Sequence, residues 1–94
     1  MPRSFQLISL PAFERDVRRR LRPNPQLLER LEEARATLRK DPYNRTREYD
    51  IRKLTDVKSG EGQWRIRVGD YRLRYDILGQ DVVLYSFRHR REVY

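Results

Sequence analysis

The sequence predicts one α+β domain, in which two N-terminal antiparallel helices cover one face of a twisted, mainly antiparallel sheet of four to five strands. Three observations support this architecture. The chain has 94 residues, which is enough for one core, so we expect a single domain over residues 1–94. Two segments in its first half repeat apolar residues with the period of a helix. Its second half alternates apolar and polar residues, as half-buried strands do.

The first half begins with a short strand predicted over residues 3–9. Pro11 then opens a predicted helix over residues 12–22. Apolar residues recur at every fourth position of this helix and form one narrow stripe, which consists of Phe13, Val17 and Leu21. The arginines on the other side of the helix are expected to be solvated.

A second helix is predicted over residues 25–40. Asn24 suits the N-cap position and Pro25 the first helical position, where no backbone N–H is needed. Asp41 and Pro42 end the helix. The link between the two helices is short, so we expect them to be antiparallel. The predicted core face of this helix consists of Leu27, Leu28, Leu31, Ala34 and Leu38.

The second half of the chain reads as sheet. Tyr49 and Ile51 are predicted to share the core face of a first strand, which is followed by a polar loop over residues 55–62. Two-residue turns at Gly69–Asp70 and Gly79–Gln80 separate the later strands. The predicted strands are residues 47–54, 63–68, 71–77 and 82–88.

The turn at Gly69–Asp70 determines how the two strands beside it pair. It places two arginines directly opposite two others, Arg67 opposite Arg72 and Arg65 opposite Arg74. Like charges in such positions are destabilising, so we expect an exposed arginine face that binds a polyanion. In the alternative, the arginines splay apart, pair with Asp76 or Gln63, and cover the sheet with their aliphatic stems.

The orientation of the last strand depends on a bulge. If the Gly79–Gln80 turn carries one, Val83, Tyr85 and Phe87 face the core, and Arg88 and Arg90 join the arginine face. Without it, Val82, Leu84 and Ser86 point inward. We expect the bulge, because it buries more aromatic surface.

Charge and composition narrow the function. The chain carries 22 basic and 14 acidic residues, a formal net charge of +8, and all but three of the basic residues are arginine. It has no cysteine and one histidine, which excludes disulfides, zinc–cysteine sites and multi-histidine metal sites. We therefore expect no metal and no cofactor. No apolar run is long enough to span a bilayer and no signal peptide opens the chain, so we expect a soluble, cytoplasmic protein with no membrane partner.

The stretch QWRIRVGDYRLRYDI, followed by VVLYSFRHRREVY, resembles the RelE/ParE superfamily of bacterial and archaeal toxins. The resemblance covers nearly the whole chain and implies a small-ribonuclease-like fold and a toxin of a type II toxin–antitoxin system. RelE-type members cleave mRNA in the ribosomal A site, and ParE-type members poison DNA gyrase. Members of both types are neutralised by an antitoxin that wraps the toxin.

The resemblance also implies roles for individual residues. Arg72 matches the arginine that contacts the scissile phosphate, and Arg88 the one that stabilises charge and protonates the leaving group. Tyr94 matches the tyrosine that orients or activates the nucleophile. Arg65 and Arg67 match positions that hold the mRNA phosphates, and Arg90 matches a nearby basic residue of the closing motif. Arg74 is not matched by the resemblance, but it belongs to the opposed arginine pairs, so we expect it to bind RNA with these three.

The expected chemistry needs no metal, because RNA supplies its own 2′-hydroxyl nucleophile. Catalysis would then rest on in-line positioning and on stabilisation of the pentavalent phosphate by Arg72 and Arg88, whose side chains we expect to be exposed. Tyr94 is the leading candidate for the general base, with His89 and Glu92 as alternatives.

Three functions remain open at this point. The first is a ribosome-dependent endoribonuclease whose partners are mRNA in the A site and the 16S rRNA of the small subunit. The second is a gyrase inhibitor without nuclease activity, and the third a degenerate member that only binds its antitoxin. The +8 charge predicts a small acidic antitoxin that is disordered alone and docks beside the two helices.

Overall fold

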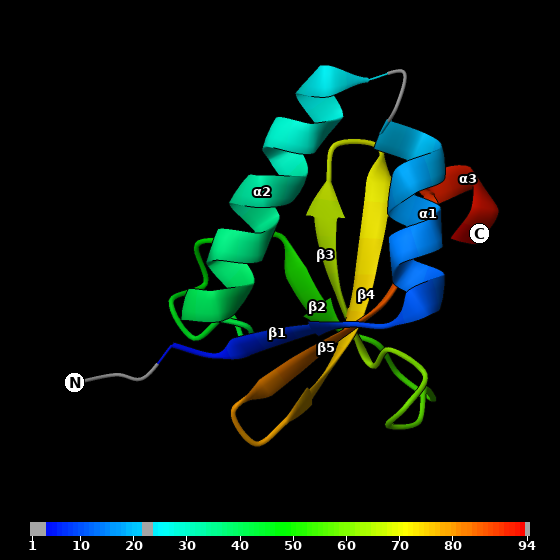
Figure 1. Ribbon diagram of the computed structural model, residues 1–94. Helices are drawn as coiled ribbons and strands as arrows, with labels where there is room; N and C mark the ends of the chain where they lie inside the picture. The colour runs from blue at the N-terminus through cyan, green and yellow to red at the C-terminus, as the bar shows by residue number, and fades with distance from the viewer. Residues whose placement is uncertain (1–3, 22–23, 94) are drawn as a thin grey trace.

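The computed structural model describes residues 4–21 and 24–93, and these form a mixed sheet of five strands with three helices (Figure 1). The strand order is β1-β5-β4-β3-β2. The strands are β1 (Gln6–Ser9), β2 (Ile51–Lys53), β3 (Trp64–Val68), β4 (Tyr71–Leu78) and β5 (Asp81–His89). The helices are α1 (Pro11–Leu21), α2 (Pro25–Lys40) and α3 (Arg90–Val93).

Helices α1 and α2 run in opposite directions over the same face of the strongly twisted sheet, which confirms the predicted α+β architecture (Figure 1). The core lies between these two layers, and its fully buried members come from both: Phe13, Leu31, Leu38, Leu73, Leu84 and Phe87. Within the described part of the chain, no helix is long and apolar enough to cross a membrane.

The predicted ends of α2 are confirmed. The side chain of Asn24 accepts a hydrogen bond from the Leu27 N–H at 3.2 Å, and Pro25 is the first helical residue. At the other end, Asp41 is the C-cap, and its N–H donates to the Thr37 carbonyl at 2.7 Å. The prediction that Leu28 lies in the core is wrong, because its side chain is 45% exposed. It lines an open groove between the helices together with Val17 and Leu21 of α1.

Strand β1 is the exception to the antiparallel sheet, because it pairs in parallel with β5, with Leu7 opposite Val82 and Ile8 opposite Val83. In the sequence, α1 and α2 separate β1 from the other four strands. Such a long connection allows β1 to pair in parallel with β5. The prediction began this strand at residue 3, which lies outside the described residues.

The predicted register of the β3–β4 hairpin is confirmed. Val68 lies opposite Tyr71, with Gly69 in the left-handed region at a φ of 61°. The arginine pairs follow as expected, Arg67 with Arg72 and Arg65 with Arg74. Ile66 and Leu73 form the neighbouring pair and are buried beneath the helices, so the arginines point away from them.

The bulge predicted for β5 exists, but at another position. The Gly79–Gln80 turn is regular, with Leu78 opposite Asp81. The register shifts further along, where Tyr75 pairs with Leu84 but the adjacent Arg74 pairs with Ser86, so Tyr85 has no partner.

This bulge changes which residues of β5 reach the core. Val82 and Leu84, before it, are fully buried, and so is Phe87 after it. The prediction that Val83 and Tyr85 face the core is therefore wrong, whereas the predictions for Phe87 and Arg88 are confirmed. A bulge in mid-strand buries apolar residues on both sides of the shift, which a bulge at the turn would not.

The first predicted strand of the second half is shorter than expected. Ile51 is buried in β2 as predicted, but Tyr49 precedes the strand and packs half-buried against the core. The long loop that follows is fastened to the sheet by Asp76, whose buried carboxylate accepts the N–H groups of Gly62 and Gln63 at 3.0 Å each.

Candidate nucleic-acid interface

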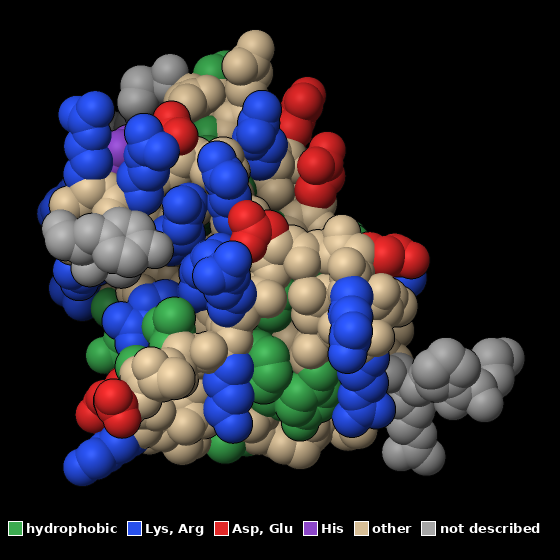
Figure 2. All heavy atoms as spheres, turned by 180° about the vertical axis from the view of Figure 1, so that it is seen from behind, with side chains coloured by type: hydrophobic (Ala, Val, Ile, Leu, Met, Phe, Trp, Pro, Cys, Tyr) green, Lys and Arg blue, Asp and Glu red, His purple; other side chains and the backbone are tan. Residues whose placement is uncertain are grey.

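The face of the sheet opposite the helices carries six arginines, which we call the arginine face, and Figure 2 shows basic side chains gathered over this side. They form two rows across neighbouring strands. In one row Arg52, Arg65 and Arg74 lie directly opposite one another, and in the other Arg67, Arg72 and Arg88 do so. The Cα atoms of opposed residues in such ladders lie about 4.5–5.5 Å apart, so each row concentrates positive charge.

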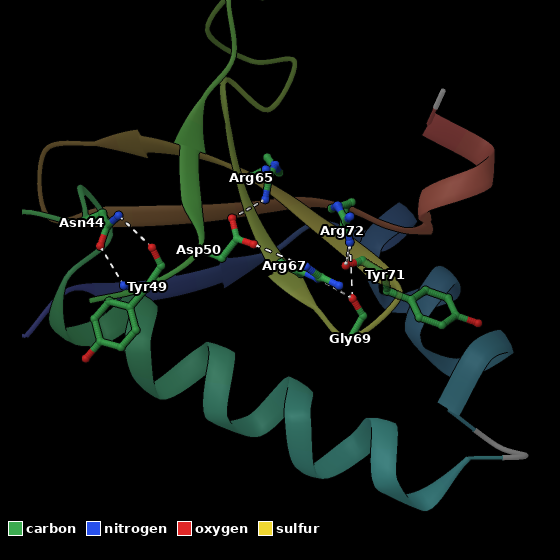
Figure 3. Close-up of polar contacts among 8 residues, drawn as sticks. All are labelled: Asn44, Tyr49, Asp50, Arg65, Arg67, Gly69, Tyr71 and Arg72. Atoms are coloured by element: carbon green, nitrogen blue, oxygen red, sulfur yellow. Dashed lines mark hydrogen bonds and ion pairs between the residues drawn. The ribbon is translucent and has the colours of Figure 1, made fainter. Parts of the chain in front are cut away.

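Most of these arginines are held in place by the protein. Asp50 lies between two of them, 3.0 Å from Arg65 and 3.9 Å from Arg67 (Figure 3). Arg74 donates to the backbone carbonyls of Glu61 and Gly62 at 2.7 and 3.1 Å. The alternative interpretation expected these arginines to pair with Asp76 or Gln63. Both of those side chains instead form hydrogen bonds with the loop between β2 and β3. The arginines are held by Asp50 and by backbone carbonyls.

The arginines of the second row, Arg67, Arg72 and Arg88, differ in their exposure and in their hydrogen bonds. Arg72 is half-buried and donates to the carbonyls of Gly69 and Tyr71 at 3.4 and 3.1 Å (Figure 3), while its Nε is buried without a partner. The expectation that Arg72 is exposed is therefore wrong. Arg88 is exposed as expected, and within the described residues its guanidinium makes no hydrogen bond or ion pair. Arg88 is thus the member of the row that can bind a ligand without first releasing a partner.

Replacing Asp50 with asparagine should strengthen RNA binding. The amide keeps a hydrogen-bond acceptor for Arg65 but removes the negative charge that pairs with Arg65 and Arg67. We expect the Kd for single-stranded RNA to fall roughly 2- to 5-fold, the size of a surface ion pair of up to ~1 kcal/mol. Fluorescence anisotropy measures this Kd. Asp56→Asn, which makes the same charge change in the loop after β2, is the matched control and should have a smaller effect.

The histidine does not lie on the arginine face. His89 pairs with Tyr71 across the sheet, on the same side as the buried pair of Leu73 and Phe87. Its ring packs edge-on against Tyr71, with centroids 5.2 Å apart, and its Nδ1 accepts the Arg91 N–H at 3.2 Å. His89 therefore faces the helix layer and is not placed to act on a ligand of the arginine face.

Glu92 is also engaged. Arg20 of α1 donates to both carboxylate oxygens of Glu92 at 2.7 Å, which fastens α3 to α1. The hydrogen bond from Arg20 holds the pKa of Glu92 below its usual range, so this carboxylate is a poor proton acceptor. Arg90 is exposed and is the first residue of α3, beyond the end of the β5 ladder. Tyr94 lies outside the described residues.

Sequence reasoning missed Arg52. Its alternation with the buried Ile51 was a signal that it points away from the core. The ten-residue connection between β2 and β3 is too long to determine their register, so only the folded sheet shows that Arg52 extends the row of Arg65 and Arg74.

The model of the family described as "ParE toxin of type II toxin-antitoxin system, parDE" matches residues 8–94. The chain belongs to this ParE toxin family. It is therefore a toxin of a type II toxin–antitoxin system, and the resemblance to the RelE/ParE superfamily inferred from its strands is confirmed. No curated protein resembles this ParE-family toxin significantly in sequence.

Solved structures share the fold of this ParE-family toxin. YafQ from E. coli superposes with a TM-score of 0.72 at 14% identity, covering 96% of this chain and 98% of its own. The RelB–RelE antitoxin–toxin complex from Methanococcus jannaschii gives 0.70 at 19% identity, covering 93% and 94%. The RelBE2 toxin–antitoxin complex from Mycobacterium tuberculosis gives 0.69 at 23% identity, covering 93% and 99%. At these identities the likeness concerns the fold alone.

Proposed function

We propose that this toxin is a ribosome-dependent, metal-independent endoribonuclease that cleaves mRNA in the ribosomal A site. The observation that carries the proposal is the row of Arg67, Arg72 and Arg88, directly opposed on three adjacent strands. Such a row stabilises the extra negative charge of a pentavalent phosphate, while the substrate's own 2′-hydroxyl attacks in line. The products are then a 2′,3′-cyclic phosphate and a 5′-hydroxyl.

The contacts of each arginine support a division of roles. Arg88 is exposed and unpaired among the described residues, so it suits the leaving group and the developing charge. Arg72 is held by the carbonyls of Gly69 and Tyr71, so it suits a fixed contact with the scissile phosphate. The flanking phosphates are assigned to Arg65, Arg67, Arg74 and Arg90. Because His89 and Glu92 are engaged elsewhere, Tyr94 is the general base in this proposal.

Single-turnover cleavage on purified ribosomes tests the proposal. An mRNA with a defined A-site codon should be cut in the presence of EDTA at a level that leaves ribosomes intact, and the 3′ end should be a cyclic phosphate. The same RNA without ribosomes should be cut far more slowly. Absence of A-site cleavage by folded toxin would contradict the proposal.

A second candidate function is inhibition of DNA gyrase without nuclease activity. Two observations favour it: the family model that matches is that of ParE, and no free general base faces the arginine face within the described residues. A supercoiling assay with purified gyrase separates the two candidates. A degenerate member would be inactive in both assays and bind only its antitoxin. Each of these targets is cytoplasmic, and we assign the toxin to the cytoplasm on that ground.

Binding to free RNA should be sequence-tolerant and steeply dependent on salt. Arginines on an exposed sheet face contact phosphates, which carry no base information, and each contact releases counterions. We expect log Kd to rise linearly with log salt, by about 0.7 for each phosphate contacted. Anisotropy titrations of two unrelated oligonucleotides between low and moderate salt measure the slope. A salt-insensitive Kd, or a large difference between the sequences, would contradict phosphate binding.

We also propose a small acidic antitoxin as partner. An open groove of about 740 Å³ between the helices is lined by Val17, Leu21 and Leu28, with Arg18 and Arg19 at its side. This combination suits an amphipathic segment that presents apolar side chains and carboxylates. Two of the structures with the same fold contain a toxin bound to its antitoxin, which supports the proposal. Co-purification with a small acidic protein encoded beside this gene tests it, and recovery of non-toxic monomer at high expression without such a gene would contradict it.

A further inference from the structure

A second basic site adjoins the arginine face. A depression of about 290 Å³ lies between α1 and the second half of β5, and we call it the α1–β5 pocket. Three of its lining residues are arginines, two from the helix and one from the strand. The lining side chains relevant here are Arg15, Asp16, Arg19, Tyr85, Ser86 and Arg88.

None of the three arginines at the pocket forms an ion pair with a described residue, although, in addition to the hydrogen bond from Arg20, the charge of Arg88 helps to lower the pKa of Glu92. Arg15 and Arg19 are four residues apart, so they project from one side of α1, where like charges destabilise a helix. Both are exposed, and no described carboxylate lies within ion-pair distance of them or of Arg88. Their arrangement is therefore unfavourable unless an anion binds between them.

Asp16 also lines the pocket, but its carboxylate is already used. It accepts the Phe87 N–H at 3.3 Å, on the edge of β5 that β1 leaves unpaired, and it lies 3.7 Å from the Arg20 guanidinium. Arg20 is shared between Asp16 and Glu92, so it offsets the charge of Asp16 only in part. Three arginines against one carboxylate still leave the pocket with a net positive lining.

The pocket is continuous with the arginine face. Arg88 belongs to both, because it lines the pocket and lies opposite Arg72. The bulge in β5 leaves Tyr85 unpaired on this side of the sheet, where the Arg74 guanidinium lies 5.9 Å from the centre of its ring. Tyr85 therefore stands between the two arginine groups and offers an aromatic surface to a base.

We propose that the α1–β5 pocket binds a phosphate of the RNA strand next to the one held by Arg72 and Arg88, with an adjacent base against Tyr85. This inference rests on the proposed function, since it takes the ligand of the arginine face to be a single-stranded RNA. The strand then continues from the sheet onto α1, and Arg15 and Arg19 bind its backbone. The pocket lengthens the RNA-binding site and adds affinity without sequence preference.

The test compares the double variant R15A/R19A with the matched control Arg18→Ala. Arg18 lies on the same helix but lines the groove between α1 and α2 instead. All three positions are exposed, and alanine favours helix, so the variants should fold. The probe is a fluorescein-labelled 2′-O-methyl oligoribonucleotide of eight nucleotides, which has no free 2′-hydroxyl and cannot be cleaved.

The expected result is that the Kd of R15A/R19A depends less steeply on salt concentration than the Kd of the wild type. The slope of log Kd against log salt should fall by about 0.7 in R15A/R19A, the value for one phosphate on a single strand. Arg18→Ala should keep the wild-type slope. Equal slopes for R15A/R19A and the wild type, or an equal loss in Arg18→Ala, would overturn the inference.

Cleavage of A-site mRNA on ribosomes, measured alongside, distinguishes failure of the pocket inference from failure of the proposed nuclease function. If wild-type toxin cleaves A-site mRNA but R15A/R19A keeps the full slope, the pocket inference fails and the nuclease proposal stands. If no cleavage occurs but R15A/R19A alone loses slope, the pocket still binds single-stranded nucleic acid and the nuclease proposal fails.

Discussion

Replacing Arg88 with alanine should lower the single-turnover rate of A-site mRNA cleavage by about 10²–10³-fold, which corresponds to ~3–4 kcal/mol of transition-state stabilisation. Arg88 lies opposite Arg72 and is exposed, with no partner among the described residues. Its guanidinium can therefore bind the phosphate without first releasing a hydrogen-bond or ion-pair partner among these residues. Quenched-flow or manual time courses at saturating toxin measure the rate directly.

The control for this variant is Arg39→Ala, which removes the same charge from the exposed side of α2. It should leave the rate within a few-fold of the wild type. Arg88→Ala should also keep the wild-type melting temperature, because substitutions of unpaired surface residues usually change stability by no more than about 0.5 kcal/mol. Full cleavage by Arg88→Ala would remove this residue from the catalytic assignment, and a large fall in melting temperature would make it structural.

Arg72→Ala should impair cleavage as well, but it is a less clean test. Its guanidinium bonds to two carbonyls at the β3–β4 turn, so the substitution also removes contacts that shape the hairpin. The comparison with Arg88 therefore separates loss of charge from loss of structure.

Replacing Phe13 with alanine should destabilise the fold by about 3–5 kcal/mol, a large share of the ~5–15 kcal/mol typical of such domains. Phe13 is fully buried, and its ring packs edge-on against Phe87, with centroids 6.3 Å apart. Phe13 thus connects α1 to β5, and Val17 is the other buried residue of this helix. Urea unfolding followed by the fluorescence of Trp64 measures the free energy of unfolding.

Leu28→Ala provides the matched comparison. This leucine is 45% exposed in the groove between the helices, so its truncation should cost less than about 1 kcal/mol. Phe13→Leu should recover much of the stability lost in Phe13→Ala. A cost below ~1 kcal/mol for Phe13→Ala would contradict the described packing of α1.

Much of the candidate site was predictable because it depends on local geometry. The two-residue turn at Gly69 and Asp70 determines the register of β3 and β4, and the period of two determines that their arginines share one face. The N-cap at Asn24 and the following proline are equally local. In these cases the residues that interact are neighbours in the chain.

Contacts between distant segments could not be predicted in this way. The position of the β5 bulge allows Leu84 and Phe87, which lie on either side of it, both to be buried. The direction of His89 follows from its pairing with Tyr71, and the neutralising role of Asp50 from the approach of β2 to β3. None of these leaves a periodic signal in the sequence.

The sequence by itself determined that this chain pairs a helical layer with an arginine-rich hairpin, because hydrophobic period and turn length act over a few residues. Only the tertiary structure decided how far the basic surface extends. Arg52 joins it through the register of β2, and Arg15 and Arg19 through the packing of α1 beside β5. These arginines are separated from the hairpin by long segments of chain. Their positions depend on how the whole core packs, so no single segment of the sequence predicts them.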